Sequence, residues 1–570
     1  MLVSLAFSAI VTVALSGFAA EPAKLFHRQY HIADSSFCYA QGCVDFNGDG
    51  RRELLFASRG TGELQMLNAA DGTVRWSRRL AGQQQSISIF DLNGDGNFEI
   101  VYTVSSPGRL YVLDHHGTVL RQWDSGDWKL GNSPVVIDGN GDGVLDGYFG
   151  TRGKDLIRLN MLDLSVIVQR TPWIQCGCHI SAMDVDRNGR WDLFAGSGDD
   201  RSAQGVLHRL DPVTLESVWS YDVRDNASSA DPVLADITGD GRVEIIKSVD
   251  NYAGDEAHDG VYAFKTDGTL LWKVAGLAGE DSPNVADLNG DGQVEIVGMT
   301  FGGDVYCLDA SGEVRWRRDL RPELSDKAHA YMTPILCDLN GDGNLEILAM
   351  TNGPYFDKTT GGPHGILFAL SADGEILDQF DVGGPRFWGE AYVANVDDDP
   401  FLSVILSGSG GLDVIKTRGF GPNTEHFQRR RCYRRLNVLP WAYEDSYFMY
   451  RGHKENVENL TDNLVLAQED GGHRPAGRFT TELLTLPPGC AFTAVDYDAD
   501  IPGDTELQVN LLSRSGNSIR ENVADGTRLK MAFDEIAEPL QLEFLFKTSD
   551  RSVSPKLNSY RLSFEQAVSE

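Results

Sequence analysis

The stretch Asp45-Phe46-Asn47-Gly48-Asp49-Gly50-Arg51-Arg52-Glu53-Leu54 has the spacing of a calcium-binding loop. Carboxylate or amide oxygens stand at its first, third and fifth positions, and an acid stands at the ninth. Gly50, at the sixth position, suits a sharp turn with positive φ. Calcium takes roughly six to eight oxygen ligands, often from alternating positions of this kind. The stretch therefore predicts the front half of a calcium loop that leads into a strand.

The same pattern occurs seven times, which separates it from the ordinary Asp, Asn and Gly clusters of turns. We expect about seven Ca²⁺ ions, mainly structural, one in each loop. The predicted ligands are Asp45, Asn47, Asp49 and Glu53; Asp91, Asn93, Asp95 and Glu99; Asp138, Asn140, Asp142 and Asp146; Asp184, Asp186, Asn188 and Asp192; Asp236, Thr238, Asp240 and Glu244; Asp287, Asn289, Asp291 and Glu295; and Asp338, Asn340, Asp342 and Glu346.

An eighth copy of the pattern is degenerate. Asn395, Asp397 and Asp399 stand at its first, third and fifth positions, but Pro400 replaces the glycine and Ser403 replaces the closing acid. Proline has a fixed negative φ and cannot make the turn that the glycine makes. We therefore expect the eighth loop to hold no calcium.

The chain of 570 residues has a net charge of −33. Each of the seven complete loops contributes three carboxylates, and seven Ca²⁺ ions would leave a charge of about −19. Part of the acidity is thus explained by metal ligands. The remaining charge argues against a nucleic-acid partner, because such proteins need a basic surface.

Residues 1–20 are typical of a secretory signal peptide, since an apolar run ends in small residues before Glu21. The usual basic residues before the apolar run are missing, so an uncleaved anchor is the alternative. No other stretch is long enough to span a bilayer. We expect a secreted, periplasmic or cell-surface protein, without a membrane span once the signal is cleaved. The eight cysteines, which include Cys176 and Cys178, form either disulfides or buried thiols.

The loops recur at intervals of 46 to 57 residues, which indicates a repeat architecture. Six of the seven complete loops are followed by a clear hairpin pattern, for example Gly62 to Trp76 and Gly303 to Trp316, while the third hairpin is the most degenerate. A strand before the loop, a strand after it and the hairpin give four strands, which is one blade of a β-propeller. The fold class expected is therefore all-β.

Spacing predicts how the propeller closes. Trp76 lies fifteen residues before Asp91, and Tyr30 lies fifteen residues before Asp45. The chain should therefore begin with the fourth strand of the last blade, which leaves no open sheet edge. We expect an eight-bladed propeller over residues 22–420, with seven blades as the alternative because the eighth loop is degenerate.

Beyond the propeller the periodicity stops. Five arginines crowd residues 429–435, either in a connector that lies on the acidic calcium face or in an anion site. We expect a connector over residues 421–477 and a C-terminal β-sandwich over residues 478–570. The strand-like runs behind the sandwich prediction are 479–486, 491–497, 506–512, 540–547 and 557–564.

The seven loops resemble the FG-GAP and VCBS repeats of integrin-α-type β-propellers over roughly residues 25–420. The resemblance implies calcium in the loop between the first and second strands of each blade. Eight-bladed rhamnogalacturonan lyases are similar in loop type and blade number, but none of their catalytic motifs matches here. The hairpins that end in tryptophan also resemble quinoprotein repeats, although the chain has no adjacent pair of cysteines.

Propeller geometry places the long insertions, 250–259 and 352–364, on the face opposite the calcium loops. The connections between blades on that face mix aromatic, cationic and acidic residues, which suits a sugar or uronate ligand. The alternative is that these residues have a structural role and only satisfy strand ends and contacts with neighbouring blades. These residues are Trp128, Lys129, His179, Asp231, Glu280, Asp281, Lys327, His329, Tyr331, Arg386, Trp388 and Glu390.

Three functions stay open at this point. The first is binding of an extracellular polysaccharide or cell-surface ligand, with lyase-type cleavage as an extension. In cleavage, Arg386 or one of the lysines Lys129, Lys327 and Lys358 would neutralise a uronate carboxylate. The base that takes the C5 proton would be His179 or His329, ahead of His258, His364 and Tyr331. The second is a non-catalytic adhesion or scaffold propeller that binds protein. The third is a quinoprotein-like enzyme, which would carry a chromophore.

Overall fold

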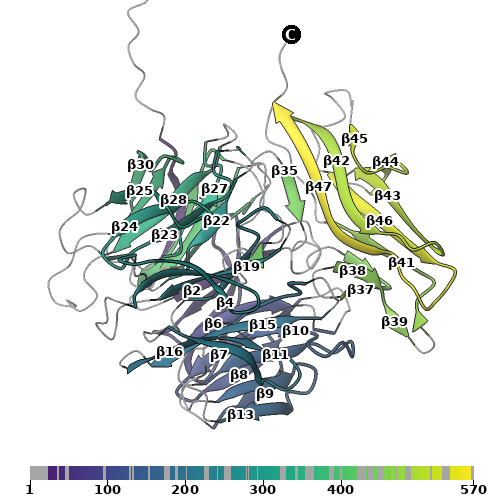
Figure 1. Ribbon diagram of the computed structural model, residues 1–570, viewed down its shortest axis with the longest axis horizontal. Helices are drawn as coiled ribbons and strands as arrows, with labels where there is room; N and C mark the ends of the chain where they lie inside the picture. Colours follow the sequence, from purple (N-terminus) through teal and green to yellow (C-terminus); the bar gives the residue numbers. More distant parts are fainter. Residues whose placement is uncertain are drawn as a thin grey trace, which may run out of the picture.

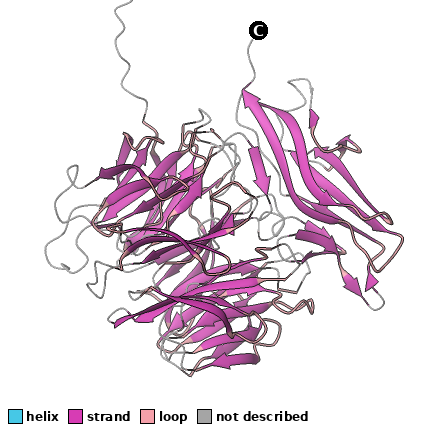
Figure 2. Cartoon of the chain, viewed as in Figure 1, coloured by secondary structure: helices cyan, strands magenta, loops and turns pink. Residues whose placement is uncertain are grey.

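Strands are the only regular elements in the described part of the chain, as Figure 2 shows, which confirms the all-β prediction. The computed structural model describes residues 24–34, 38–44, 46, 51–90, 92–93, 98–126, 130, 134–151, 155–171, 180–186, 190–199, 202–223, 230–240, 242–249, 258–277, 279, 281–289, 291, 293–320, 329–330, 332–340, 344–352, 365–383, 390–397, 401–419, 432–433, 442–445, 453–460, 463–469, 472–481, 490–513, 516–528 and 540–566.

Eight antiparallel sheets, numbered here in chain order, lie within the described residues up to 419 (Figure 1). Sheet one contains β2 (Cys38–Val44), β3 (Glu53–Ser58), β4 (Glu63–Asn68) and β5 (Val74–Arg79). Sheet two contains β6 (Gln83–Phe90), β7 (Glu99–Ser105), β8 (Arg109–Leu113) and β9 (Val119–Asp124). Sheet three contains β10 (Val135–Ile137), β11 (Asp146–Gly150), β12 (Leu156–Asn160) and β13 (Val166–Arg170). Sheet four contains β14 (Ile180–Met183), β15 (Asp192–Asp199), β16 (Ser202–Leu210) and β17 (Ser217–Asp222).

The later sheets repeat this order with two variations. Sheet five contains β18 (Val233–Ala235), β19 (Glu244–Val249), β20 (Gly260–Lys265) and β21 (Leu270–Val274). Sheet six contains β22 (Asn284–Ala286), β23 (Glu295–Met299), β24 (Asp304–Leu308) and β25 (Val314–Asp319). In sheet seven the first strand is split, since β26 (His329–Ala330) and β27 (Ile335–Cys337) both pair with β28 (Glu346–Asn352), which β29 (Ile366–Leu370) and β30 (Ile376–Asp381) follow. Sheet eight contains β31 (Glu390–Ala394), β32 (Ser403–Gly408), β33 (Gly410–Lys416) and β1 (His27–Asp34).

The sheets are arranged as a β-propeller. The first strands of most neighbouring sheets contact one another, which places them at the centre. Second strands such as β3 and β7 are buried along their whole length, whereas fourth strands such as β5 are largely exposed. Burial on both faces explains why the second strands are almost purely apolar after their first residue.

The ring closes through the first strand of the chain, as the spacing of Tyr30 predicts. β1 pairs antiparallel with β33, with His27 opposite Lys416 and Asp34 opposite Gly410. The Tyr30 hydroxyl donates to the carbonyl of Ala69 in sheet one at 2.9 Å. The earliest described strand therefore completes the last sheet and also contacts the first.

In four sheets, a tryptophan of the fourth strand attaches the sheet to the next one. Trp76, Trp219, Trp272 and Trp316 donate Nε1–H to the carbonyls of His115, Thr266, Ala310 and Ala372 at 2.8–2.9 Å. Each accepting turn also brings a glycine against the ring, so that a Cβ on Gly374 would lie 2.7 Å from Trp316. Tyr30 replaces tryptophan at the seam, where a Cβ on Gly72 would lie 2.7 Å from its ring.

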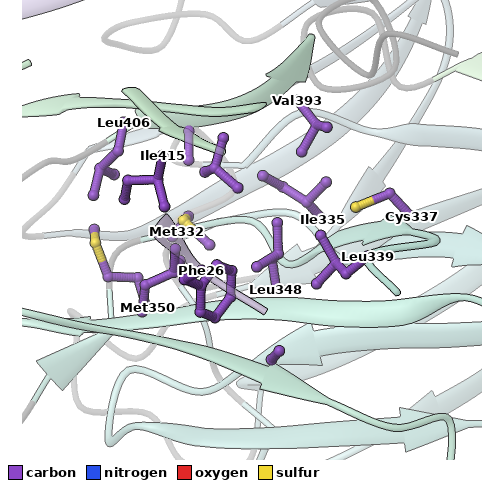
Figure 3. Close-up of a cluster of buried hydrophobic side chains, with 14 of the residues drawn as sticks. Phe26, Met332, Ile335, Cys337, Leu339, Leu348, Met350, Val393, Leu406 and Ile415 are labelled. Atoms are coloured by element: carbon purple, nitrogen blue, oxygen red, sulfur yellow. The ribbon is translucent and has the colours of Figure 1, made fainter. Parts of the chain in front are cut away.

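The apolar cores lie between neighbouring sheets. Figure 3 shows the core between sheets seven and eight, where Leu348 and Met350 face Val393, Leu406 and Ile415. Phe26, just before β1, is buried in the same cluster. The N-terminal segment is thus held by side-chain packing as well as by strand pairing.

Two further sheets, which share one apolar core, follow the propeller. One contains β35 (Ala442–Asp445), β37 (Val457–Leu460), β38 (Asn463–Leu466), β42 (Cys490–Asp500), β45 (Thr527–Arg528) and β47 (Lys556–Gln566). The other contains β36 (His453–Glu455), β41 (Ala476–Thr480), β43 (Thr505–Ser513), β44 (Ser518–Arg520) and β46 (Leu540–Thr548), and β39 (Gln468–Glu469) pairs separately with β40 (Gly472–His473).

The C-terminal sheets begin earlier than the sequence indicates. β35 pairs with β47 and β36 pairs with β41, although both lie in the predicted connector. Their polar sequences hide them, because short strands at a sheet edge need little apolar surface. Elsewhere in the predicted connector, β34 (Cys432–Tyr433) pairs parallel with β18, the innermost strand of sheet five. The inner edge of β18 offers the backbone groups that this pairing needs. The five arginines that flank β34 lie outside the described residues, so their place on the calcium face stays a prediction.

Four cysteines, Cys38, Cys43, Cys307 and Cys337, are buried thiols. Of the two alternatives for the cysteines, buried thiols therefore hold for these four. Within the described residues, no helix is long and apolar enough to cross a membrane.

Candidate functional site

The eight predicted loops all lie between the first and second strands of their sheets. In each, the residue at the ninth position is the first residue of the second strand. These residues are Glu53, Glu99, Asp146, Asp192, Glu244, Glu295, Glu346 and, in the degenerate loop, Ser403. The predicted position of the candidate metal loops in the fold is therefore correct.

Five of the closing acids are glutamates that hold their own loop shut. In loop five, Glu244 Oε2 accepts the backbone N–H of Ile237, the second loop residue, at 3.0 Å. The same bond joins Glu53 to Phe46, Glu99 to Leu92, Glu295 to Leu288 and Glu346 to Leu339, at 2.6–3.0 Å. The glutamate satisfies a buried amide and leaves its other oxygen for a further partner.

Loops three and four close with the shorter aspartate, and there an arginine of the third strand completes the contact. Arg158 donates from Nε and Nη2 to Asp146 Oδ2 at 2.8 and 2.5 Å, and both side chains are buried. Arg209 donates to Asp192 Oδ1 at 2.7–3.0 Å. Asp192 Oδ2 is buried and has no hydrogen-bond partner among the described side-chain contacts.

Loop three is described completely and shows the predicted turn. Gly143, at the sixth position, has φ +82°, and a Cβ there would meet nothing within 4 Å, so backbone conformation alone favours glycine. Asp138 accepts the N–H groups of Gly141, Asp142 and Gly143 at 2.7–3.2 Å. Its carboxylate is therefore turned onto the loop backbone.

The carboxylates of one loop repel one another. The pKa of Glu244 is raised to about 7, chiefly by burial and in smaller part by the nearby carboxylates of Asp236 and Asp240. Burial also raises the pKa of Glu295, and the negative charges of Asp291 and Asp287 contribute to this increase. Concentrated negative charge at a buried oxygen is the condition that a bound cation relieves.

The loops suit calcium by the type of their donor atoms and not by the present arrangement of their side chains. Among the described residues, no three His, Cys, Asp or Glu side chains form a group that could hold a metal. The donors are nevertheless all oxygens, three of them carboxylates in each complete loop, and Asp192 contributes a buried oxygen without a described hydrogen-bond partner. These donors suit a hard cation, around which the side chains would have to gather. Of the predicted ligands, Asp45, Asn47, Asp49, Asp91, Asp95, Asn188 and Asp342 lie outside the described residues.

On the opposite face most predicted residues cannot be placed. His179, Tyr331 and Arg386 lie outside the described residues, as do Trp128, Lys129, Glu280, Lys327, Lys358, His364 and Trp388. His329 begins β26, opposite Asn352 of β28. The catalytic assignment of these residues therefore stays a prediction.

A buried lysine on β19 escaped the sequence reasoning. Lys247 is fully buried, and its Nζ donates to the carbonyls of Ala230 and Ser248 at 2.6 and 2.9 Å. Ala230 comes just before β18, so the ammonium ties a connection between two blades to a second strand. A cation inside the apolar strand Glu244–Val249 is the sequence signal that marks this residue.

Comparison with known proteins gives a local repeat match and a fold. Residues 45–102 match the model of the FG-GAP-like repeat. Lambda-carrageenases from Pseudoalteromonas sp and Pseudoalteromonas carrageenovora are 40% identical over 58 residues, which are 10% of this chain and 6% of each relative. The chain thus matches only a small part of these relatives.

Among solved structures, the V. cholerae biofilm matrix protein Bap1 matches with a TM-score of 0.51 and 13% identity, over 69% of this chain and 91% of that chain. BamB from Moraxella catarrhalis matches with a TM-score of 0.46 and 14% identity, over 69% of this chain and 100% of that chain. Identities this low concern the fold alone. The predicted similarity to rhamnogalacturonan lyases stays a prediction. Taken together, the repeat match and the strand order describe a β-propeller that contains an FG-GAP-like repeat over residues 45–102.

Proposed function

We propose that this chain is an exported β-propeller, stabilised by calcium, that binds extracellular polysaccharide on the face opposite its calcium loops. The observation that carries the proposal is the 40% identity to lambda-carrageenases, which are named for a polysaccharide. The acidic surface argues against nucleic acid, and the first twenty residues have the pattern of an export signal. The long insertions 250–259 and 352–364 are expected on the face opposite the calcium loops, and long loops on a folded scaffold commonly bind ligands.

Binding is tested by affinity electrophoresis in gels that contain carrageenan, pectin, another uronate polymer or a neutral glucan. We expect retardation by at least one polymer in calcium. The same mobility in every gel, together with capture of a defined protein partner, would favour the adhesion or scaffold alternative. A chromophore in the purified protein would favour the quinoprotein alternative.

The calcium component has its own test. Three carboxylates in one loop repel one another, and an ion that binds the folded state alone stabilises it by mass action. EDTA should lower the Tm, and added Ca²⁺ should restore it. Elemental analysis should find about seven calcium ions per chain. An unchanged Tm and no bound calcium would contradict this component while leaving polysaccharide binding open.

Cleavage is the second candidate, because the relatives in question are named as enzymes. Product release from carrageenan and from uronate polymers is followed by new reducing ends and by the ultraviolet absorbance of unsaturated sugars. We expect His179→Ala and His329→Ala to abolish lyase activity while the Tm is kept. Binding without any product would place the protein in the non-catalytic class.

A further inference from the structure

Two cationic side chains from outside loop eight reach its first and third ligand positions. Arg52 Nη1 donates to Asn395 Oδ1 at 2.6 Å, and Lys416 Nζ lies 2.7 Å from Asp397 Oδ1. Asn395 and Asp397 stand at the first and third ligand positions of this loop. Both ligand oxygens are therefore already paired with positive charge that the chain supplies.

Arg52 belongs to the neighbouring loop, where its position is unusual. It stands at the eighth position of loop one, and the other seven loops have an apolar residue there: Phe98, Leu145, Trp191, Val243, Val294, Leu345 and Leu402. An apolar side chain is thus sufficient for a loop to form. The arginine of loop one instead reaches across to the first ligand position of loop eight.

Lys416 stands beside the position where loop eight lacks the closing acid. It lies directly opposite Ser403, the residue that replaces the acid of the complete loops. An anion has been lost and a cation gained within one cross-strand pair. Lys265 has the same register in sheet five, opposite Glu244, but its side chain is exposed and its loop keeps the acid.

Loop eight is also the place where the ring closes. Gln29 of β1 donates to Asp397 Oδ2 at 3.1 Å and to the carbonyl of Ala70 in sheet one at 2.8 Å. β1, sheet eight and sheet one therefore meet at this loop. Any contact that fixes Asp397 also fixes the seam of the ring.

We propose that Arg52 and Lys416 act as internal cations in loop eight, so that the sheet at the ring seam stays closed without calcium. Their charges attract Asn395 and Asp397 at any metal concentration, and they repel an incoming Ca²⁺ ion. The other seven loops keep the predicted set of calcium ligands instead. This inference depends on the proposed calcium binding only for the contrast with those loops.

The first test measures the Tm in EDTA, where calcium plays no part. Lys416→Met and Arg52→Leu should each lower it by roughly 2–6 °C, because the first removes the cation of a partly buried ion pair and the second removes the charged donor to Asn395 Oδ1. Saturating calcium should leave these losses unchanged. Lys416→Arg, which keeps the charge, should retain most of the Tm, and Lys265→Met is the matched control that should keep it. Wild-type Tm in both Lys416→Met and Arg52→Leu would overturn the inference.

The second test counts bound calcium by elemental analysis. Asp397→Ala should lower the Tm and leave the number of ions unchanged, whereas Asp186→Ala in loop four should remove one ion. Loss of one ion in Asp397→Ala would show that loop eight binds metal and would overturn the inference. If wild type holds no calcium at all, the proposed calcium binding fails, and the EDTA measurement alone decides the role of Arg52 and Lys416.

Discussion

At the residue scale, the closing glutamate has two roles that can be separated. Glu244 accepts the N–H of Ile237 and is a predicted calcium ligand, and burial raises its pKa to about 7. Glu244→Gln keeps an oxygen that can accept the amide but removes the charge. We expect one fewer calcium ion, a smaller gain of Tm on calcium addition, and an equal or higher Tm in EDTA.

The control for this change is Glu244→Ala, which removes the acceptor as well. A buried amide without a partner costs about 1–3 kcal/mol, so this variant should lose stability in EDTA too. Equal calcium content in Glu244→Gln and wild type would contradict a ligand role for this side chain.

The half-buried His208 predicts a loss of stability in acid. Burial lowers its pKa from 6.5 to about 4, and its ring nitrogens lie 3.1 and 3.2 Å from the hydroxyls of Ser197 and Ser217. Because the unfolded chain binds this proton more readily, stability falls as the pH drops from 6.5 towards 4. The loss is at most about 3 kcal/mol.

His208→Gln measures this contribution, because glutamine does not titrate. Chemical unfolding of both proteins between pH 7.5 and 4.5 should show a steeper loss for wild type below pH 6.5. Carboxylates that titrate in the same range affect both proteins alike and cancel in the difference. Parallel stability curves would mean that His208 is protonated in the folded protein.

At the scale of elements, the joint between neighbouring sheets predicts a difference between two glycines of similar backbone conformation. Gly374 has φ +79° and a Cβ there would lie 2.7 Å from Trp316, whereas Gly383 has φ +77° and open space around it. Alanine at either site costs about 1–2 kcal/mol for the left-handed backbone.

Only Gly374→Ala also displaces the tryptophan ring. We expect a further loss of about 1–3 kcal/mol from overpacking, measured by denaturant unfolding against Gly383→Ala. Equal losses in the two variants would show that the ring contact contributes nothing to the joint.

The sequence predicts elements well where the signal is local. A loop and the first residue of the next strand lie within nine positions, so Glu53 correctly marks the start of β3. The position of Tyr30 can be predicted because it lies fifteen residues before Asp45, the same spacing that separates Trp76 from Asp91. Contacts between distant residues leave no such mark: Arg52 and Asn395 are 343 positions apart, and neither residue type indicates the other. The residues of the opposite face stand in connections of variable length, so their arrangement does not follow from the repeat.

At the scale of the whole molecule, the ring depends on one strand. A variant that lacks residues 24–34 would leave the edge of β33 unpaired, because β1 covers it in the intact protein. Exposed edges promote association with other chains. We expect a lower Tm and concentration-dependent oligomers by light scattering.

Two comparisons separate ring closure from nonspecific damage. A synthetic peptide of residues 24–34 should restore the monomer and part of the Tm. Tyr30→Phe keeps the strand and loses only the hydroxyl bond to Ala69, so it should cost about 1 kcal/mol and remain monomeric. A truncated protein with wild-type Tm and mass would show that β1 is dispensable.

The pairing of β1 with β33 also sets a minimum delay between the synthesis of β1 and its pairing. His31 and Asp413, which lie 3.0 Å apart in the seam, are 382 residues apart in the chain. A ribosome that adds about 5–20 residues per second needs about 20–80 s to travel that distance. Throughout translation of the repeats, the earliest strand has no partner of its own to join. The exposed and half-buried side chains of β1 suit a segment that stays solvated and unpaired until the last repeat has been synthesised.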